Sequence, residues 1–446
     1  MKKTILITLL LFVGLLNAQE KIRQSYSFSL QQAIDHAIKN NYQAINSGRD
    51  IEIAEKKKWE TTAMGLPQIN GNASYQNNFK LQTSVIPAEF LGGTPGEFAE
   101  VTFGTKHNAA ASLGLTQLLF DGSYIVALQA SKTYLEFYKN YKKKTDTDIK
   151  EMIINSYGSV LLANENALNL QKNKTILEKT VFETNETFKN GLIEEENVEQ
   201  LKITLAGITS NLDYNNRLKE ISLNMLKINL GIDIKDELII TDQLDNLAIS
   251  NMDLAFTNND FDVKNNINYL ISDNFVQQRS LELKLERSKA LPSLGAAVNF
   301  GYNTFGNTFT FLQSNNRWFN YSNLGLNLNI PIFSSLERSA RTQQAKIELE
   351  KAKTLLTQSE EQLKLQFQIA KSDYEFRIEQ YNSAKESLKL AERIENKQRI
   401  KFKEGLSSSF DFTEAQRQLY ASQQSFLQTM VDVINKKAAL EKIITK

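Results

Sequence analysis

The chain has 446 residues, with 52 basic residues against 51 acidic ones, two histidines and no cysteine. This charge balance gives no support for nucleic-acid binding, so nucleic acid is not expected as a partner. The lack of cysteine excludes disulfides, thiol catalysis, Cys-ligated metals and an acylated N-terminal cysteine.

The N-terminus is typical of a secretory signal peptide, which we predict at residues 1–18. Lys2 and Lys3 precede an apolar run from Ile5 to Leu16, and a short polar exit follows. The run is too short and too near the terminus for a membrane-spanning helix, and no other stretch approaches the roughly 18 apolar residues needed. The protein is therefore expected to be exported, and any membrane location would not depend on helices.

The remaining sequence repeats one order of landmarks twice. A Leu-Pro step precedes an alternating segment in each half, at about 68–80 and at about 293–303, and second alternating segments follow at about 109–120 and 321–333. Phe120 and Phe333 lie 213 residues apart, and Gly191 and Gly405 lie 214 apart. Such agreement predicts internal duplication. We expect a first repeat at 19–230, an acidic connector at 231–264 and a second repeat at 265–446.

Each repeat is expected to hold a helix, a strand pair and a long helical hairpin, with the two hairpin tips at residues 191 and 405. Apolar residues recur every seven positions in the second hairpin, which is coiled-coil spacing with one stutter: Leu349, Leu356, Leu363, Ala370, then Tyr374, Tyr381 and Leu388. A helix from 334 to 402 would be about 100 Å long at roughly 1.5 Å per residue. That length argues against the alternative, a charged helix in an ordinary bundle. The first repeat carries 12 more residues between its strands than the second, which we assign to a loop.

The four alternating segments suit the wall of a barrel. In the last one an apolar face alternates with an amide-rich face, the apolar residues being Leu324, Leu326, Leu328, Ile330 and Ile332. Apolar outside and polar inside is what a lipid-facing strand around a wet lumen requires, although a half-buried strand of a soluble sheet alternates in the same way. Aromatic residues near the far ends of the strands are consistent with an interfacial girdle: Tyr75, Phe79, Tyr302, Phe305, Trp318, Phe319 and Tyr321.

Four strands cannot close a barrel, and open edges in lipid leave unpaired amides. Other copies must complete it. Because a barrel of eight strands is filled by side chains, three copies with 12 strands form the smallest cyclic assembly with a real lumen. The sequence itself fixes only a multiple of four strands.

Taken together, these features resemble the TolC-like outer-membrane efflux family over essentially the whole mature chain. The resemblance rests on the signal, the opening pattern Leu30/Ala33/Ala37/Asn41, two strand pairs each led by Leu-Pro, and two hairpins broken at Gly-Leu. It implies an α+β membrane protein, a homotrimer with a 12-stranded β-barrel in the outer membrane of a Gram-negative-type bacterium, and a coiled-coil α-barrel across the periplasm. It also implies a passive exit duct for efflux or type I secretion, opened by a periplasmic adaptor (membrane fusion) protein and an inner-membrane pump.

The resemblance places function at the tips, at the end distant from the barrel. It assigns adaptor docking to Gly191, Leu192, Gly405 and Leu406, although an α-hairpin turn would explain the glycines equally well. It also implies that Asp411 and Glu414 ring the pore entrance and favour cations, while helix capping is a sufficient structural explanation for both.

The sequence departs from some members of the family at the positions that hold the entrance shut. Those members have an arginine two residues after the second glycine and an aspartate after the first turn, where this chain has Ser407 and Asn197. An identical charge-linked gate is therefore not expected. Asn197, Ser407 and Phe402 are the gate candidates that remain.

Two other function classes stay open. A periplasmic coiled-coil adaptor or scaffold without a pore would explain the helices but not the two strand pairs. An exported enzyme is disfavoured because His36 and His107 are the only histidines, and no metal-ligand spacing, nucleophile elbow or phosphate loop occurs. No enzyme activity, cofactor or metal site is expected. The sequence does not indicate the exported substrate.

Overall fold

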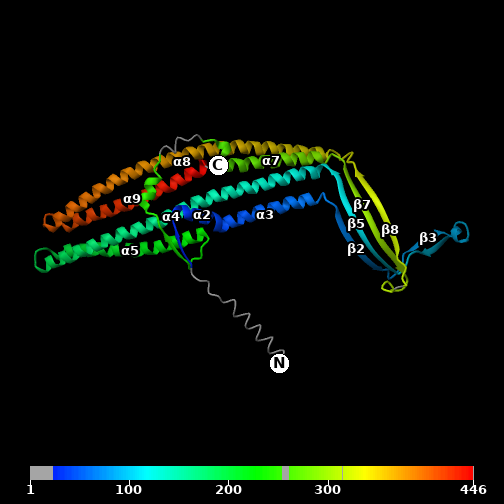
Figure 1. The fold of residues 1–446 in the computed structure, drawn as a ribbon, viewed down its shortest axis with the longest axis horizontal. Coiled ribbons are helices and arrows are strands. Elements are labelled where there is room, and N and C mark those ends of the chain that lie inside the picture. Colours follow the sequence, from blue (N-terminus) through cyan, green and yellow to red (C-terminus); the bar gives the residue numbers. More distant parts are fainter. Residues whose placement is uncertain (1–23, 254–260, 314, 445–446) are drawn as a thin grey trace, which may run out of the picture. The chain divides into compact units, whose positions relative to one another are not determined.

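The computed structural model describes residues 24–253, 261–313 and 315–444 (Figure 1). The predicted signal peptide, residues 1–18, lies outside them, as does the part of the connector at 254–260. The chain divides into two compact units. One holds the described residues of 1–50, 139–272 and 357–446, and the other holds those of 51–138 and 273–356.

The second unit is built around a four-stranded antiparallel sheet. Its strands are β2 (Gln68–Asn77), β5 (His107–Asp121), β7 (Ser293–Gly306) and β8 (Phe319–Asn329), hydrogen-bonded in the order β2-β5-β7-β8. The two strand pairs of the repeats thus join through β5 and β7, and β2 and β8 are left as edges.

The register gives the sheet two chemically different faces. Residues that pair directly in antiparallel strands project from the same face, and Ile69, Leu115, Val298 and Leu324 fall in one such row. We call this the apolar face, and its leucines on β8 are 57–69% exposed. The opposite row starts from Asn70 and Asn299, and we call it the polar face. The alternation predicted along single strands therefore holds across the middle of all four.

Three details of the sheet unit differ from the sequence prediction. β8 ends at Asn329, so Ile330 and Ile332 lie outside the strand, because Pro331 has no amide hydrogen to continue the ladder. β7 runs on to Gly306, while β2 stops at Asn77. The 12 extra residues of the first half lie in a segment that is not plain loop: it forms a hairpin of β3 (Thr83–Pro87) and β4 (Phe98–Thr102) around a short 3-10 helix at Ala88–Leu91.

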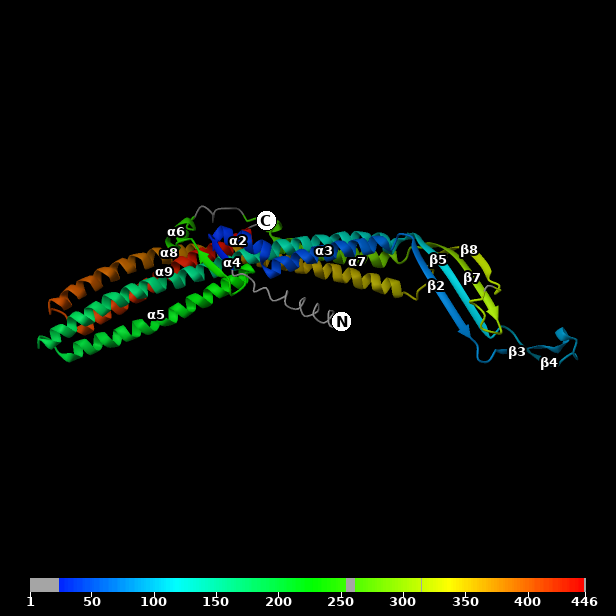
Figure 2. The ribbon, with the colours of Figure 1, turned by 60° about the horizontal axis from the view of Figure 1, so that its bottom comes forward.

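Long helices make up most of the rest. α4 (Gly122–Lys189) has 68 residues and α8 (Glu337–Lys403) has 67, and both contribute residues to the two units. α5 (Glu195–Leu230) and α9 (Ser409–Ile444) complete the two hairpins in the first unit, and α3 (Tyr42–Ala63) and α7 (Ile267–Ser288) are shorter. In Figure 2, α4 runs beside α5 and α8 beside α9. Within the described residues, no helix is both long enough and apolar enough to cross a membrane.

A two-stranded parallel sheet of β1 (Ser25–Phe28) and β6 (Glu237–Ile240) packs against the core of the first unit and contributes the buried Leu238 to it. α2 (Leu30–Asn40) follows β1 with a capping box between Ser29 and Gln32. The helix buries Ala33 and Ala37 against the hairpins. Two residues of the pattern Leu30/Ala33/Ala37/Asn41 are therefore core residues.

The acidic connector is structured where it is described. It contains β6, α6 (Leu244–Ser250) and a short 3-10 helix at Val263–Asn265. The Asp242 carboxylate accepts hydrogen bonds from the Leu30 amide at 2.6 Å and from the Tyr157 hydroxyl at 3.0 Å. Burial, together with this aspartate, raises the pKa of Tyr157 to about 12, so its phenol remains a donor. Asp242 of this segment thus binds the N-terminus of α2.

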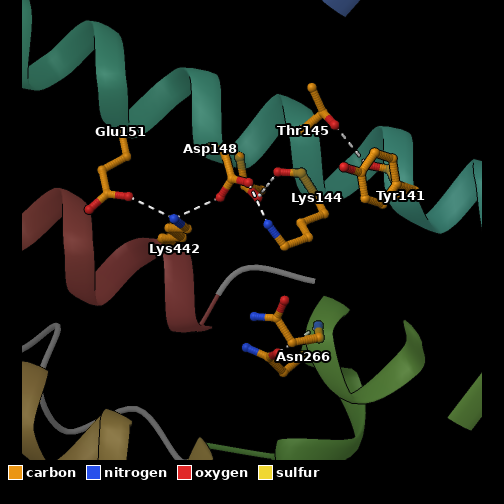
Figure 3. Close-up of polar contacts among 9 residues, drawn as sticks. Tyr141, Lys144, Thr145, Asp148, Glu151, Asn266 and Lys442 are labelled. Carbon is orange, nitrogen blue, oxygen red and sulfur yellow. Dashed lines mark hydrogen bonds and ion pairs between the residues drawn. The ribbon is translucent and has the colours of Figure 1, made fainter. Parts of the chain in front are cut away.

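An ionic cluster fastens the end of α9 to α4 (Figure 3). The Lys442 ammonium lies 2.7 Å from Asp148 and 2.8 Å from Glu151, and Lys144 donates to Asp148 at 2.6 Å. Burial opposes ionisation of Asp148, but these two lysines outweigh it and hold its pKa below the ordinary value. The Asn266 side chain binds the carbonyl of Ile443 at 2.8 Å beside the cluster.

Candidate functional site at the hairpin tips

The two turns of the hairpins have the same backbone construction. Gly191 has φ +73° and Gly405 has φ +69°, the left-handed region that ends a helix without a Cβ penalty. The following amides return to the last helical turn, Leu192 to the carbonyl of Thr187 at 3.2 Å and Leu406 to that of Lys401 at 2.8 Å. No neighbouring atom lies within 4 Å of a Cβ built on either glycine, so conformation and not space demands the glycine.

The leucine after each glycine projects into solvent. Leu192 is 74% exposed and Leu406 is 77% exposed. A helix-stop motif often buries a nearby apolar side chain against the helix it ends, and neither leucine does so. Both are free for contact with another molecule.

Two polar contacts join the first hairpin to the second at the tips. The Lys403 ammonium lies 2.7 Å from the Glu183 carboxylate, and the Ser409 hydroxyl donates to the Gln200 side-chain oxygen at 2.8 Å. The hydrogen bond from Lys403 keeps the pKa of Glu183 below its ordinary value. The α4–α5 pair and the α8–α9 pair are therefore linked at this end.

An apolar cluster lies just behind these contacts. Phe412 is fully buried, and its ring stacks on that of Phe402 with centroids 5.3 Å apart. Leu177, Leu201 and Ile208 of the first hairpin pack against it. The cluster holds Phe402 within the packing of the two hairpins.

A cleft of about 1140 Å³ lies between the two tips, lined by both turns and the helix ends that flank them. Asn197, Gln200, Phe402, Ser407 and Asp411 are among its lining residues. The structure therefore brings together candidates that are more than 200 positions apart in the sequence.

Asp411 is held by a capping box at the start of α9. Its amide donates to the Ser408 hydroxyl at 3.1 Å, and its carboxylate accepts from the Ser408 amide at 3.3 Å. Its carboxylate also accepts from the Ser408 hydroxyl at 2.7 Å. These hydrogen bonds keep the pKa of Asp411 below its ordinary value, so the carboxylate is fixed in position and ionised.

Glu414 is paired with an arginine that the sequence analysis did not single out. The Arg417 guanidinium donates to both Glu414 oxygens, at 2.8 Å and 2.5 Å, and keeps the pKa of that carboxyl below its ordinary value. The three-residue spacing on one helix could have revealed this pair. Glu414 therefore carries a neutralising partner, whereas Asp411 does not pair with a cation among the described ion pairs.

We compared the sequence and the fold with those of known proteins. Residues 275–445 match the model of the outer membrane efflux protein family. The whole fold is similar to the CmeC outer membrane channel of Campylobacter jejuni, with a TM-score of 0.72 and 19% identity over 93% of this chain and 85% of that one. The VceC outer membrane protein of Vibrio cholerae gives 0.70 and 15% over 93% and 95%, and CusC gives 0.74 and 15% over 96% and 95%. No curated protein matches the sequence.

This chain has the TolC-like fold of outer-membrane efflux channels. The predicted resemblance is thereby confirmed, as is the fold class of strands for a barrel wall joined to long helical hairpins. The CmeC structure is that of an outer membrane channel. Among the described residues of this chain, no group of three or more His, Cys, Asp or Glu could hold a metal ion.

Within the TolC-like fold, the two polar gate candidates bond to partners of their own hairpin, whereas Phe402 also packs with the first hairpin. The Asn197 side chain donates to the Glu194 carbonyl at 3.4 Å, and the Ser407 hydroxyl donates to the Gln398 side chain at 3.0 Å. Among the described hydrogen bonds, neither side chain bonds to the other hairpin. The links that do cross, from Glu183 and Gln200, could not be found in sequence, because residues of different repeats meet there.

Proposed function

We propose that this chain is one subunit of a homotrimeric outer-membrane exit duct, a passive conduit for efflux or type I secretion. The observation that carries the proposal is the sheet, which has one apolar and one polar face and two edge strands unpaired within the described chain. Exposed Leu324, Leu326 and Leu328 suit lipid, and the polar face suits a wet lumen. Unpaired edges in lipid are removed only by closure with further copies.

The helices of the first unit support self-association. α5 and α8 each carry a stripe of large apolar side chains that are about half exposed or more, at spacings that keep them on one side of the helix: Ile203, Tyr214, Ile221 and Met225 on α5, and Ile369, Phe376 and Leu390 on α8. Neighbouring subunits would cover these stripes. Three copies with four strands each would give a 12-stranded barrel.

The tips would then form the periplasmic entrance. Exposed Leu192 and Leu406, beside Gly191 and Gly405, offer a docking surface for a periplasmic adaptor that works with an inner-membrane pump. Asp411 and Glu414 would be repeated three times around the entrance. Because Arg417 accompanies each Glu414, most of the negative field would come from Asp411.

The test is single-channel conductance of the purified mature protein in planar bilayers. We expect conducting trimers with cation selectivity that falls in Asp411→Asn, falls less in Glu414→Gln, and rises in Arg417→Gln, which serves as a control of opposite sign. Failure of folded, detergent-solubilised protein to insert or conduct would favour the alternative, a periplasmic adaptor or scaffold without a pore. If all variants conduct with unchanged selectivity, the proposal of an acidic entrance is wrong, while the proposal of a channel still holds.

A further inference from the structure

Three aromatic side chains lie on the polar face of the sheet, where an interfacial girdle would not place them. Phe305 pairs with Asn108, Phe319 with Asn303 and Tyr321 with Gly301, and all of these belong to the row of the polar face. The rings are 53%, 46% and 39% exposed. Because the proposed function has lipid on the apolar face, these three rings would lie on the lumen side and not in the girdle predicted from the sequence.

The position of the Tyr321 ring depends on the residue across the strand. A Cβ on Gly301 would lie 2.8 Å from the ring atoms of Tyr321, so the ring occupies space that a side chain at Gly301 would take. The rings of Phe305 and Phe319 lie 6.3 Å apart at a tilt of 42°. The cluster is thus a set of positioned rings open to solvent on one side.

A positively charged side chain, that of Arg317, lies beside the aromatic cluster. The Arg317 guanidinium carbon lies 4.9 Å from the centroid of Phe319, and the Thr304 hydroxyl fixes the Arg317 carbonyl at 2.9 Å. Arg317 is exposed and takes part in none of the ion pairs of the described residues. The β7–β8 connection, residues 307–318, contains no Asp or Glu. The charge is therefore free to meet an anion from solution.

We propose that Phe305, Phe319, Tyr321 and Arg317 form a binding site for planar aromatic anions. A ligand ring would stack on the protein rings, and its carboxylate or sulfonate would take the remaining donors of the guanidinium fork. The proposal rests on the channel function, because the polar face then lines the lumen and each subunit contributes one copy. Aromatic anions would dwell there during passage, while small inorganic ions would pass.

The test uses the wild-type channel in planar bilayers, with 2-naphthalenesulfonate as the probe. We expect reversible, concentration-dependent block, with no block by methanesulfonate or by a naphthyl trimethylammonium cation at equal concentration. Arg317→Gln should weaken the block at least tenfold, and Tyr321→Ala should weaken it several-fold. Tyr302→Ala is the matched control, because Tyr302 is next to Gly301 but lies on the apolar face, and it should leave the block unchanged.

Gly301→Ala is a second variant that removes no ring. It should displace the Tyr321 ring and weaken the block as Tyr321→Ala does. A conducting channel that the probe does not block, or one blocked equally after Arg317→Gln, would overturn the site and leave the channel function intact. Calorimetry of the detergent-solubilised protein measures binding of the same probe independently of conduction. A wild-type protein that neither conducts nor binds the probe would overturn both the channel and the binding site.

Discussion

The two hairpin tips share a backbone but differ in charge. With the 214-residue offset of the glycines, Asn197 corresponds to Asp411 and Gln200 to Glu414, so the first tip carries two amides where the second carries two carboxylates. The lysines before the turns also differ, because Lys189 pairs with Glu186 of its own helix while Lys403 crosses to Glu183. The two turns thus share a backbone geometry, while their side chains make different contacts.

The largest expected difference between the tips concerns their packing. Phe412 is fully buried, and its counterpart Val198 is 2% exposed. Phe412→Ala should lower the local free energy of unfolding by roughly 3–5 kcal/mol, and Val198→Ala by about half as much, because fewer buried methyl and methylene groups are lost. Hydrogen exchange followed on peptides of α5 and α9 measures both. Equal losses at the two positions would show that the apolar cluster is not centred on Phe412.

A smaller difference is expected at the helix starts. Ser408 caps α9 through its hydroxyl, whereas its counterpart Glu194 makes no side-chain cap for α5. Ser408→Ala should destabilise the first turn of α9 by about 1 kcal/mol, and Glu194→Ala should have almost no effect on α5. Exchange of the first amides of each helix reports the change. An equal response in both helices would contradict the asymmetric capping.

The smallest effect is expected from the link between the tips, which is exposed. The hydrogen bond from Lys403 lowers the pKa of Glu183 in the folded protein, so the link contributes above the ordinary glutamate pKa and is lost as pH falls through the lowered value. Glu183→Gln at neutral pH should reproduce that loss, seen as faster exchange at the end of α4. Glu186→Gln is the control and should leave the link unchanged. A tip unaffected by both acid and Glu183→Gln would show that the ion pair does not hold the hairpins together.

Much of the fold was predictable because apolar residues recur at regular spacings and because glycine and proline mark the ends of elements. Gly191 and Gly405 mark their turns by a conformation that other residues rarely adopt, and the Leu-Pro steps mark the starts of β2 and β7. Strand ends were less predictable. Ile330 and Ile332 continue the alternation of β8 in sequence, but the ladder stops before Pro331.

The candidate site was predictable only within each turn. Asp411 could be placed near the start of a helix from its spacing to Ser408, and the Glu414–Arg417 pair follows from helical spacing. The cross-hairpin partners Glu183 and Gln200 carry no local signal, because they meet Lys403 and Ser409 only after two separate hairpins pack. The same holds for the fastening of Leu30 by Asp242.

By itself the sequence determined the duplication, the type and order of the main elements, the two helix stops and the alternation of apolar and polar residues along each strand. These depend on residues that are near one another in the chain. Only the tertiary structure decided which residues share a face and which charges meet. Pairing of β5 with β7 set the register that puts Tyr302 in one row with Ala111 and Phe305 in one row with Asn108, and packing of the hairpins brought Lys403 to Glu183. Register and packing join distant segments, and no local pattern specifies them.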